Sequence, residues 1–220
     1  AGGAWSRLFA GNEGLDLPAL NVLGSVMRVD NVEGAPEESV GGSDFAFRKN
    51  IQGGYNISRR NVSVSDITPD TLRQFTKFIG SYLQTRKELR LRVGRRFLDE
   101  WRTARKWTAD NVTPFEQIRT LDPEPSHKYL NEAVRIIKRD FPAFRTMREV
   151  ERWGGLIDVT PDAVPIVGRS KTIPGLVLGV GFSGHGFGIG PGAGKLLSEI
   201  VMNTRTSVDP TPFAFERFGR

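Results

Sequence analysis

Two hundred and twenty residues, 38% of them hydrophobic and 25% charged, are enough for one large or two small globular domains with a buried core. The absence of cysteine excludes disulfides and thiolate ligands, and the two histidines, His127 and His185, are too far apart to predict a metal site. Neither a signal peptide nor a run of about 18 apolar residues is present, so we expect a cytoplasmic protein without a membrane span. The net charge of +6 favours anionic partners.

The opening residues, AGGAWSRLFAG (1–11), predict a short helical turn that begins beside a Gly-Gly corner. A buried strand normally leads into such a corner, and none precedes it in this sequence. We therefore expect a fragment or a processed subunit of a longer protein, with a trimmed but complete domain as the alternative.

Residues 17–65 have a β pattern. The runs NVLGSVMRVD, DFAFRKN and GGYNISRR show partial alternation and are broken at pairs of glycines. Because GGYNI follows FAFRKN at hairpin distance, residues 44–58 predict a β-hairpin.

Residues 68–141 are mostly helical in pattern. Thr68 or Asp70 can cap a helix with one apolar face, which consists of Leu72, Phe75, Phe78, Ile79 and Leu83. A second amphipathic helix is predicted from about residue 127 to 140, with the inward-facing residues Tyr129, Ala133, Ile136 and Ile137.

Basic and aromatic residues are interleaved between positions 86 and 107. The basic ones are Arg86, Lys87, Arg90, Arg92, Arg95, Arg96, Arg102, Arg105 and Lys106, and the aromatic ones are Phe97, Trp101 and Trp107. This combination is typical of a module that binds nucleic acid or an acidic surface. Glu88, Asp99 and Glu100 dilute the charge, so we favour a solvated face or a subunit contact and expect no nucleic-acid partner.

The β pattern returns from Val150. Thr160-Pro161-Asp162 predicts a turn, and LVLGV (176–180) predicts a strand buried on both faces. The glycine run GFSGHGFGIGPGAG (181–194) then leads into a helix that we expect from Lys195 to about Asn203. A strand, a glycine-rich turn and a helix together aim backbone N–H groups and the positive end of the helix at an electron-rich ligand.

Two common phosphate sites are excluded by the spacing within this run. The lysine and hydroxyl positions do not fit a P-loop, and no acidic strand end follows about twenty residues later, as a dinucleotide fingerprint requires. By spacing alone, the glycines indicate either a flat or anionic ligand at close approach or a tight contact between helix and sheet.

Several motifs of this region occur together in one family. They are Trp153-Gly154-Gly155, Thr160-Pro161-Asp162, Pro165-Ile166-Val167-Gly168, Pro174-Gly175-Leu176 and Gly181-Phe182-Ser183-Gly184-His185-Gly186. In this order the motifs resemble those of the FAD-dependent amine and amino-acid oxidases, which include D-amino-acid oxidase, glycine oxidase and sarcosine oxidase. The opening AGGAWS resembles the second flavin-contacting segment of that family.

The resemblance implies an α/β fold with an α+β substrate domain. We expect part of a Rossmann-like FAD-binding domain at residues 1–18 and 159–206, interleaved with an antiparallel-sheet substrate domain at 19–158 and followed by a C-terminal tail at 207–220. The family's N-terminal fingerprint for the ADP half of FAD is not found in this sequence. We therefore expect the missing FAD-binding segment, or a partner subunit, to supply it.

The resemblance also implies a cofactor, FAD, and an oxidoreductase that acts on CH–NH2 or CH–NH groups. The implied reaction is hydride transfer from the amino-bearing carbon of an amino acid or amine to flavin N5, which gives an imine that hydrolyses. A non-catalytic structural subunit is the alternative.

Flavin contacts follow from the same resemblance. They are Ala4, Trp5, Ser6, Gly184, His185, Gly186, Phe187, Gly188 and Ile189. Glycine backbone admits the ring, and the helix N-terminus faces the edge of the flavin on which negative charge gathers. His185 either acts as the general base for the substrate amino group or packs against the ring.

The substrate contacts depart from the family pattern. D-amino-acid and glycine oxidases carry a carboxylate-binding arginine just after the tryptophan-glycine stretch, where this chain has Leu156-Ile157-Asp158. Asp158 either favours a cationic amine or caps the neighbouring Thr160–Asp162 turn. Arg48 is the remaining candidate for a carboxylate clamp, with Tyr55 across the hairpin as a phenolic hydroxyl; the alternative is a solvated arginine.

Overall fold

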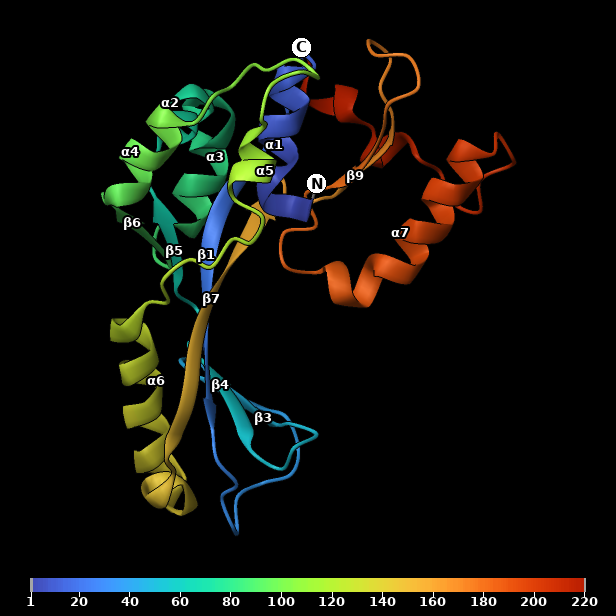
Figure 1. Cartoon of the computed structure of the whole chain (residues 1–220). Helices are drawn as coiled ribbons and strands as arrows, with labels where there is room; N and C mark the ends of the chain where they lie inside the picture. Colours follow the sequence, from blue (N-terminus) through green and yellow to red (C-terminus); the bar gives the residue numbers. More distant parts are fainter. Residues whose placement is uncertain (1, 220) are drawn as a thin grey trace.

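The computed structural model describes residues 2–219 and has a mixed α/β fold, as predicted (Figure 1). Its strands are β1 (Leu20–Val29), β2 (Val40–Gly41), β3 (Ala46–Lys49), β4 (Tyr55–Ser58), β5 (Ser63–Asp66), β6 (Leu89–Arg92), β7 (Glu149–Val159), β8 (Ile166–Arg169) and β9 (Val177–Val180). Its α-helices are α1 (Gly2–Asn12), α2 (Pro69–Arg73), α3 (Phe75–Thr85), α4 (Arg95–Arg102), α5 (Pro114–Gln117), α6 (His127–Asp140) and α7 (Gly186–Val201). Short 3-10 helices are η1 (Pro142–Thr146), η2 (Thr211–Phe213) and η3 (Phe215–Phe218).

The two longest strands of the larger sheet, β1 and β7, pair antiparallel, and β7 lies at the edge of the sheet because β1 is its only partner among the described residues (Figure 1). Their register pairs Leu20 with Val159 at one end and Val29 with Glu149 at the other. The second half of β1 also pairs with β4, and its first half pairs with β5. Beyond β4 the sheet continues through β3 and β2, while β6 runs parallel to β5. The hairpin predicted at residues 44–58 is thus present as β3 and β4.

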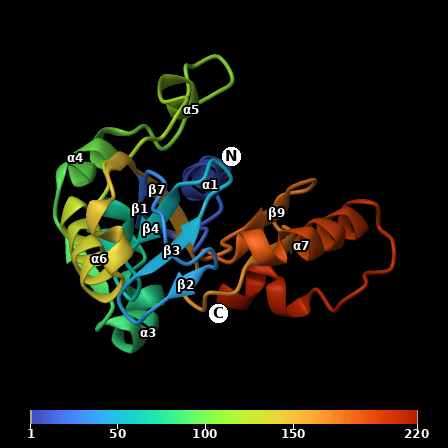
Figure 2. The ribbon, with the colours of Figure 1, turned by 90° about the horizontal axis from the view of Figure 1, so that it is seen from below.

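One side of this sheet, the α6 face, carries the main hydrophobic core. Directly opposite residues of paired strands point to the same side, so Phe47, Ile57 and Met27 form one row on this face. Helix α6 covers the row with Leu130 and Ala133, both fully buried. Figure 2 shows α6 on one side of the central strands and α7 on the other.

The other side of the β1–β7 pair is the open face. It carries Val22, Gly24 and Val26 of β1 beside Ile157, Gly155 and Trp153 of β7. Gly155 is exposed, and a Cβ at this position would meet no described atom within 4 Å. A Cβ at Gly184 would lie 3.8 Å from Ile157 Cγ2, so the turn before α7 reaches this face.

A second, smaller core joins the N-terminal segment to the C-terminal part of the chain. Its buried members are Ala10, Leu15, Leu17, Ala19, Ile166 and Leu178. Phe215 and Phe218 of η3 pack against it, so the segment predicted as a C-terminal tail folds back onto the molecule. The division into two domains remains a prediction.

The helix expected after residue 68 is divided into α2 and α3 at Gln74. Thr68, not Asp70, caps α2, because its Oγ1 accepts a hydrogen bond from the Thr71 N–H at 3.4 Å. The side chain of Gln74 is buried and donates to Asp16 at 2.6 Å, which fixes the break. Much of the predicted apolar face is exposed, at Leu72, Phe75, Ile79 and Leu83.

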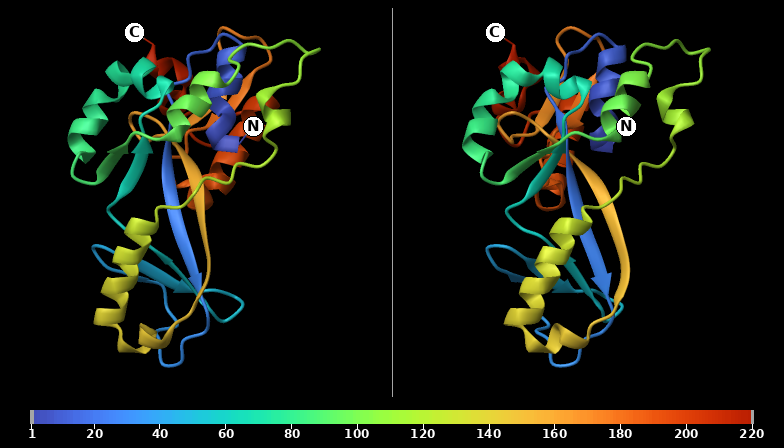
Figure 3. Two further views of the ribbon diagram at one scale, coloured as in Figure 1. Left: turned by 60° about the vertical axis from the view of Figure 1, so that its left-hand side comes forward. Right: turned by 90° about the vertical axis from the view of Figure 1, so that its left-hand side faces the viewer.

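Helix α6 has the predicted bounds, and two of the four residues predicted to face inward, Ala133 and Ile137, are fully buried. Leu130, Ala133 and Ile137 are fully buried, whereas Tyr129 and Ile136 are half-buried. Figure 3 shows α6 alongside β1 and β7, and the core on this face includes Leu130 but not Tyr129. Within residues 2–219, no helix combines the length and the apolar character that crossing a membrane requires.

The apolar run LVLGV contributes β9 but is not buried on both faces. β9 pairs antiparallel with β8, and within β9 only Leu178 is buried. A Cβ at Gly179 would meet Leu197 of α7, so this glycine allows the helix to pack closely on the two-stranded sheet.

Candidate functional site

The glycine run is helical over most of its length. Helix α7 begins at Gly186, not at Lys195 as predicted, so only residues 181–185 form the turn. The low helix propensity of glycine hides this start in the sequence. His185 is the N-cap and makes no side-chain cap hydrogen bond. Within the described residues, the N–H groups of Gly186 and Phe187 have no acceptor, as is usual in the first turn of a helix.

The flavin contacts predicted in this segment lie at the surface of the described chain. Gly184, His185, Phe187, Gly188 and Ile189 are exposed, and Gly186 is half-buried. A Cβ at Gly188 would meet no described atom within 4 Å. The start of α7 therefore combines a helix N-terminus with a surface poor in side chains, which suits a flat, electron-rich ligand.

Asp158, at the end of β7, holds the turn before α7. Its Oδ2 accepts a hydrogen bond from the Gly181 N–H at 2.6 Å, and its carbonyl accepts one from the Ser183 N–H at 3.0 Å. One of the two predictions for Asp158, that it caps the Thr160–Asp162 turn, is therefore wrong. Asp162 stabilises that turn instead, because its carboxylate accepts a hydrogen bond from the Val164 N–H at 3.1 Å.

The flavin contacts predicted at the N-terminus lie in the first turns of α1. The Ala4 carbonyl accepts a hydrogen bond from Asn21 Nδ2 at 3.3 Å, and Asn21 lies directly opposite Asp158 in the β1–β7 register. Ser6 is buried, and Trp5 lines a cavity of about 640 Å³ beside α1. The structure thus brings this segment to the same end of β7 as the turn before α7.

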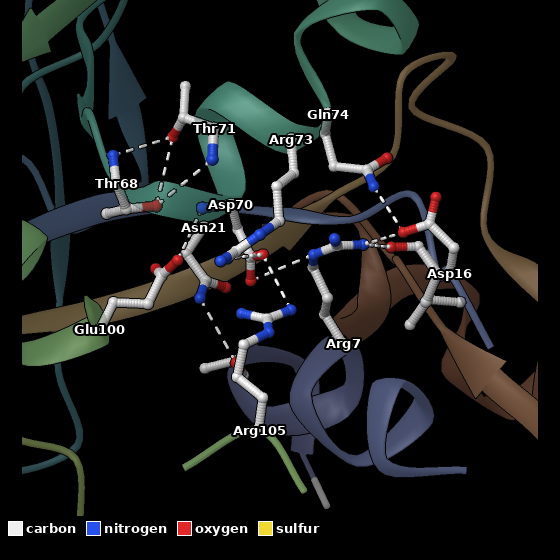
Figure 4. Close-up of polar contacts among 12 residues, drawn as sticks. Arg7, Asp16, Asn21, Thr68, Asp70, Thr71, Arg73, Gln74, Glu100 and Arg105 are labelled. Carbon is white, nitrogen blue, oxygen red and sulfur yellow. Dashed lines mark hydrogen bonds and ion pairs between the residues drawn. The ribbon is translucent and has the colours of Figure 1, made fainter. Parts of the chain in front are cut away.

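Arg7 ties α1 to the elements around it (Figure 4). Its guanidinium group pairs with Asp70 of α2 at 3.1 Å and with Asp16 at 3.0 Å, and it donates to the carbonyl of Leu17. Asp70 also pairs with Arg105 at 3.0 Å. This network, in which Arg7 and Asp70 are largely buried, fixes the helix that carries the predicted N-terminal flavin contacts.

Two carboxyl groups in the network have opposite pKa shifts. Burial raises the pKa of Asp70, but the guanidinium groups of Arg7 and Arg105 outweigh it and hold that pKa below its ordinary value. Burial, and then the negative charge of Asp70, raise the pKa of Glu100. Glu100 Oε1 accepts the Asp70 N–H at 2.7 Å, which keeps the two groups together.

A polar row crosses the open face. It consists of Arg48 of β3, Asn56 of β4, Arg28 of β1 and Glu151 of β7. Arg28 and Glu151 form an ion pair at 3.0 Å. Arg48 is exposed and has no ion-pair partner in the part of the chain that the structure describes. Together with Trp153 it lines a cavity of about 390 Å³.

The structure does not bring Tyr55 and Arg48 together. Arg48 pairs with Asn56, the neighbour of Tyr55, so the alternation along β4 puts Tyr55 on the α6 face. There it is buried against Phe47, and its hydroxyl donates to the Ala35 carbonyl at 3.3 Å.

Sequence reasoning missed three residues of the open face: Asn56, Trp153 and Ile157. Trp153 belongs to a motif that the sequence does display, but a single strand does not reveal which face of a sheet its residues occupy. Only the pairing of β7 with β1, and of β1 with β4, puts these residues on the face that carries Arg48.

Acidic side chains of the chain itself neutralise part of the basic stretch. Asp66 pairs with Arg92 at 2.6 Å and with Arg96 at 3.2 Å. Asp70 pairs with Arg105. These three arginines stabilise the fold and are less available to an external anion.

The model of the family described as "FAD dependent oxidoreductase" matches residues 1–200. The chain belongs to this family. FAD is the family's cofactor, so the cofactor predicted from the motifs is confirmed at the family level. The described residues fit such a group, because the helix start at Gly186 and the open positions Gly155 and Gly188 leave room for a flat ring.

One curated relative matches part of the chain, and solved relatives match nearly all of it. It is 36% identical to the sarcosine oxidase subunit beta of an Arthrobacter species over 78 residues, 36% of this chain and 19% of that protein. Its fold matches L-amino acid deaminase from Proteus myxofaciens, solved in complex with anthranilate, with a TM-score of 0.93 and 34% identity, over 100% of this chain and 49% of that one. L-amino acid deaminase from Proteus vulgaris matches with a TM-score of 0.91 and 28% identity, over 99% of this chain and 50% of that one. The chain thus spans about half the length of these solved relatives.

Proposed function

We propose that this chain belongs to an FAD-dependent enzyme that oxidises the amino-bearing carbon of an amino acid. It would form the substrate-binding side and part of the surface that holds the flavin ring, the flavin seat. One observation carries the proposal. The turn before α7 reaches Ile157 on the same face of the sheet that carries Arg48 and Trp153. A flavin ring at that turn and a carboxylate at Arg48 would therefore share one surface.

The start of α7 is proposed to hold the flavin. When bound, FAD supplies the hydride acceptor. The N–H groups of Gly186 and Phe187 and the positive end of the α7 dipole would stabilise negative charge at the edge of the ring, without any rearrangement of the protein. Gly184 and Gly188 keep side chains out of the path of the ring.

Arg48 is proposed to orient the substrate by its carboxylate. Glu151 already neutralises Arg28, so Arg48 is the cation of the polar row that is free to bind an anion. Trp153 and Val26 line the same cavity with apolar surface, against which the substrate side chain can pack. The anthranilate held by the Proteus myxofaciens relative also carries a carboxylate and an amino group, which supports a ligand of this chemistry.

His185 has two proposed roles. Its ring is exposed at the N-cap of α7, at the edge of the proposed flavin seat. From there it either packs against the ring or accepts a proton from the substrate ammonium group. Loss of that proton leaves the nitrogen lone pair that expels hydride from the neighbouring carbon, and the resulting imine hydrolyses.

The arrangement of domains and partners is likewise proposed. The smaller core joins the N-terminal segment to β8 and β9, which supports the assignment of residues 1–18 and 159–206 to the flavin side and of 19–158 to the substrate side. A further FAD-binding segment, or a partner subunit, would hold the ADP half of the cofactor.

Anaerobic flavin reduction tests the proposal. The FAD-loaded protein is mixed with phenylalanine, and separately with phenethylamine, which lacks only the carboxylate. We expect phenylalanine to bleach the visible flavin absorption and phenethylamine to do so far more slowly. Equal rates would remove the carboxylate clamp from the proposal, and no bleaching by any amino acid or amine would contradict the proposed reaction.

A further inference from the structure

The two segments that the proposed function assigns to the flavin meet at one carboxylate. Asp158 accepts the Gly181 N–H of the turn before α7 at 2.6 Å. The same carboxylate lies against Gly3 of α1 so closely that a Cβ at this glycine would overlap it. Asp158 is only 9% exposed, so these contacts are its main surroundings.

Asn21 completes the arrangement from the neighbouring strand. It lies directly opposite Asp158 in the β1–β7 register and donates to the Ala4 carbonyl at 3.3 Å. The end of the β1–β7 pair therefore contacts Gly3 and Ala4, in the first turn of α1, through two adjacent side chains. Of these two side chains, only that of Asp158 also contacts the turn before α7.

A buried carboxylate needs compensation for the water it has lost. Asp158 has no ion-pair partner in the described chain; its compensation comes from the Gly181 N–H and from the start of α1, where the helix dipole favours negative charge. Both sources belong to the segments in question. The electrostatics of Asp158 therefore hold the two segments to each other.

We propose that Asp158 is a positioning residue that keeps the first turn of α1 and the turn before α7 at one separation and thereby sets the seat of the flavin. This inference rests on the proposed function. Asp158 does not itself touch the substrate, because it lies on the side of β7 opposite Ile157. Its effect reaches the flavin through the backbone of the two segments.

The contact that Asp158 makes with both segments, the Asp158 clamp, can be measured without cofactor. Amide hydrogen exchange at Gly181 and Ser183 is compared between wild type, Asp158→Ala and Asp162→Ala. Asp162 is the control, because it also accepts a backbone N–H, from Val164, and its ion-pair partner Arg217 lies in η3, outside both segments. We expect exchange at Gly181 to be about tenfold faster in Asp158→Ala, which corresponds to about 1.4 kcal/mol, and unchanged in Asp162→Ala. Unchanged exchange in Asp158→Ala would overturn the clamp.

The consequence for the flavin is measured by FAD titration of the full protein. We expect Asp158→Ala to raise the FAD dissociation constant about tenfold and to shift the visible absorption band, and Asp162→Ala to do neither. Asp158→Asn keeps the size of the side chain and one oxygen acceptor, so it should recover part of the affinity and remain informative where truncation unfolds the protein.

The outcomes separate the two proposals. Wild-type affinity and spectrum in Asp158→Ala, together with faster exchange at Gly181, would show that the clamp does not set the flavin seat. A wild-type protein that binds no FAD even together with the segment or partner that holds the ADP half would refute the proposed function and the flavin part of this inference with it. The exchange experiment would still decide the clamp.

Discussion

Arg28 and Glu151 lie directly opposite each other on β1 and β7 and form a 3.0 Å ion pair on the open face. Arg48 lies in the same cross-strand row, on β3, and has no ion-pair partner among residues 2–219. The row therefore keeps one uncompensated positive charge beside Trp153. A carboxylate bound there would gain a charge-assisted hydrogen bond without displacing an existing partner.

Removal of this charge should discriminate between substrates. We expect Arg48→Ala to lower kcat/KM for an amino acid, with a loss of about 2–4 kcal/mol in transition-state binding free energy, because a charge-assisted and partly desolvated pair is lost. The corresponding amine without a carboxylate should be unaffected. Lys49→Ala is the matched control, since Lys49 pairs with Tyr55 in register and thus points to the α6 face. An unchanged kcat/KM for the amino acid in Arg48→Ala would move the carboxylate site elsewhere.

A side chain at position 188 should block the flavin and spare the fold. A Cβ at Gly188 meets no described atom, and valine is a better helix residue than glycine, so Gly188→Val should leave the free energy of unfolding within about 1 kcal/mol of wild type. FAD binding should nevertheless be abolished. Gly194→Val, also in α7 at an open position but outside the predicted contacts, should bind FAD normally. Full FAD binding by Gly188→Val would show that the ring does not approach this part of the helix.

The turn before α7 should be intolerant of any side chain at Gly181. Its φ of +73° costs an alanine about 1–2 kcal/mol, and the new Cβ would overlap Thr160 Cγ2. Gly175 has a similar φ of +80° but open space around it, so Gly175→Ala measures the backbone cost alone. By denaturant unfolding, Gly181→Ala should be destabilised by about 1–3 kcal/mol more than Gly175→Ala. Equal losses would mean that Thr160 moves aside freely.

Glu100 should make the protein less stable as the pH rises. Burial and the charge of Asp70 raise the pKa of Glu100 in the folded protein. The folded state thus binds this proton more tightly than the unfolded state does, so its stabilising effect is complete below the unfolded pKa of about 4.3 and is lost as the pH rises through the folded pKa. Glu100→Gln keeps an oxygen that can accept the Asp70 N–H and should raise Tm at neutral pH.

The pH profile provides the check on this variant. A gain of about 1 kcal/mol corresponds to about 2–4 °C in a protein of this size. The advantage of Glu100→Gln should disappear near pH 4, where Glu100 of the wild type is protonated as well. A constant difference between the two proteins from pH 4 to pH 8 would exclude the charge of Glu100 as its cause.

Local patterns predicted local structure well. The hairpin at 44–58 and the helix from residue 127 follow from spacing and turn residues that act within a few positions of each other. The N-terminal segment was predicted as a short helical turn, whereas α1 runs from Gly2 to Asn12. The start of α7 was misjudged for the opposite reason. Glycines at 186, 188, 190, 192 and 194 disfavour a helix locally, and the packing of α7 on β9 outweighs that preference.

The candidate site depends on pairings that a single sequence does not contain. Arg48 was chosen from its strand alone, yet its neighbourhood with Trp153 requires the register of four strands. Tyr55 was paired with Arg48 across the hairpin, but a shift of one residue in register decides which face a side chain occupies. Asp158 was assigned to the nearest turn in sequence, whereas its partner Gly181 is 23 residues away.

The ladder between β1 and β7 sets a fixed distance along the open face. This ladder joins the polar row at Glu151 to the proposed flavin end at Ile157, which are six positions, or about 20 Å, apart along one strand. Deletion of one residue from β7 would turn every following side chain to the opposite face, whereas deletion of two would keep the faces and shorten the span by about 7 Å. Relatives that act on shorter or longer substrates should therefore differ in the side chains on this face, or by pairs of residues in these strands, and not by single insertions.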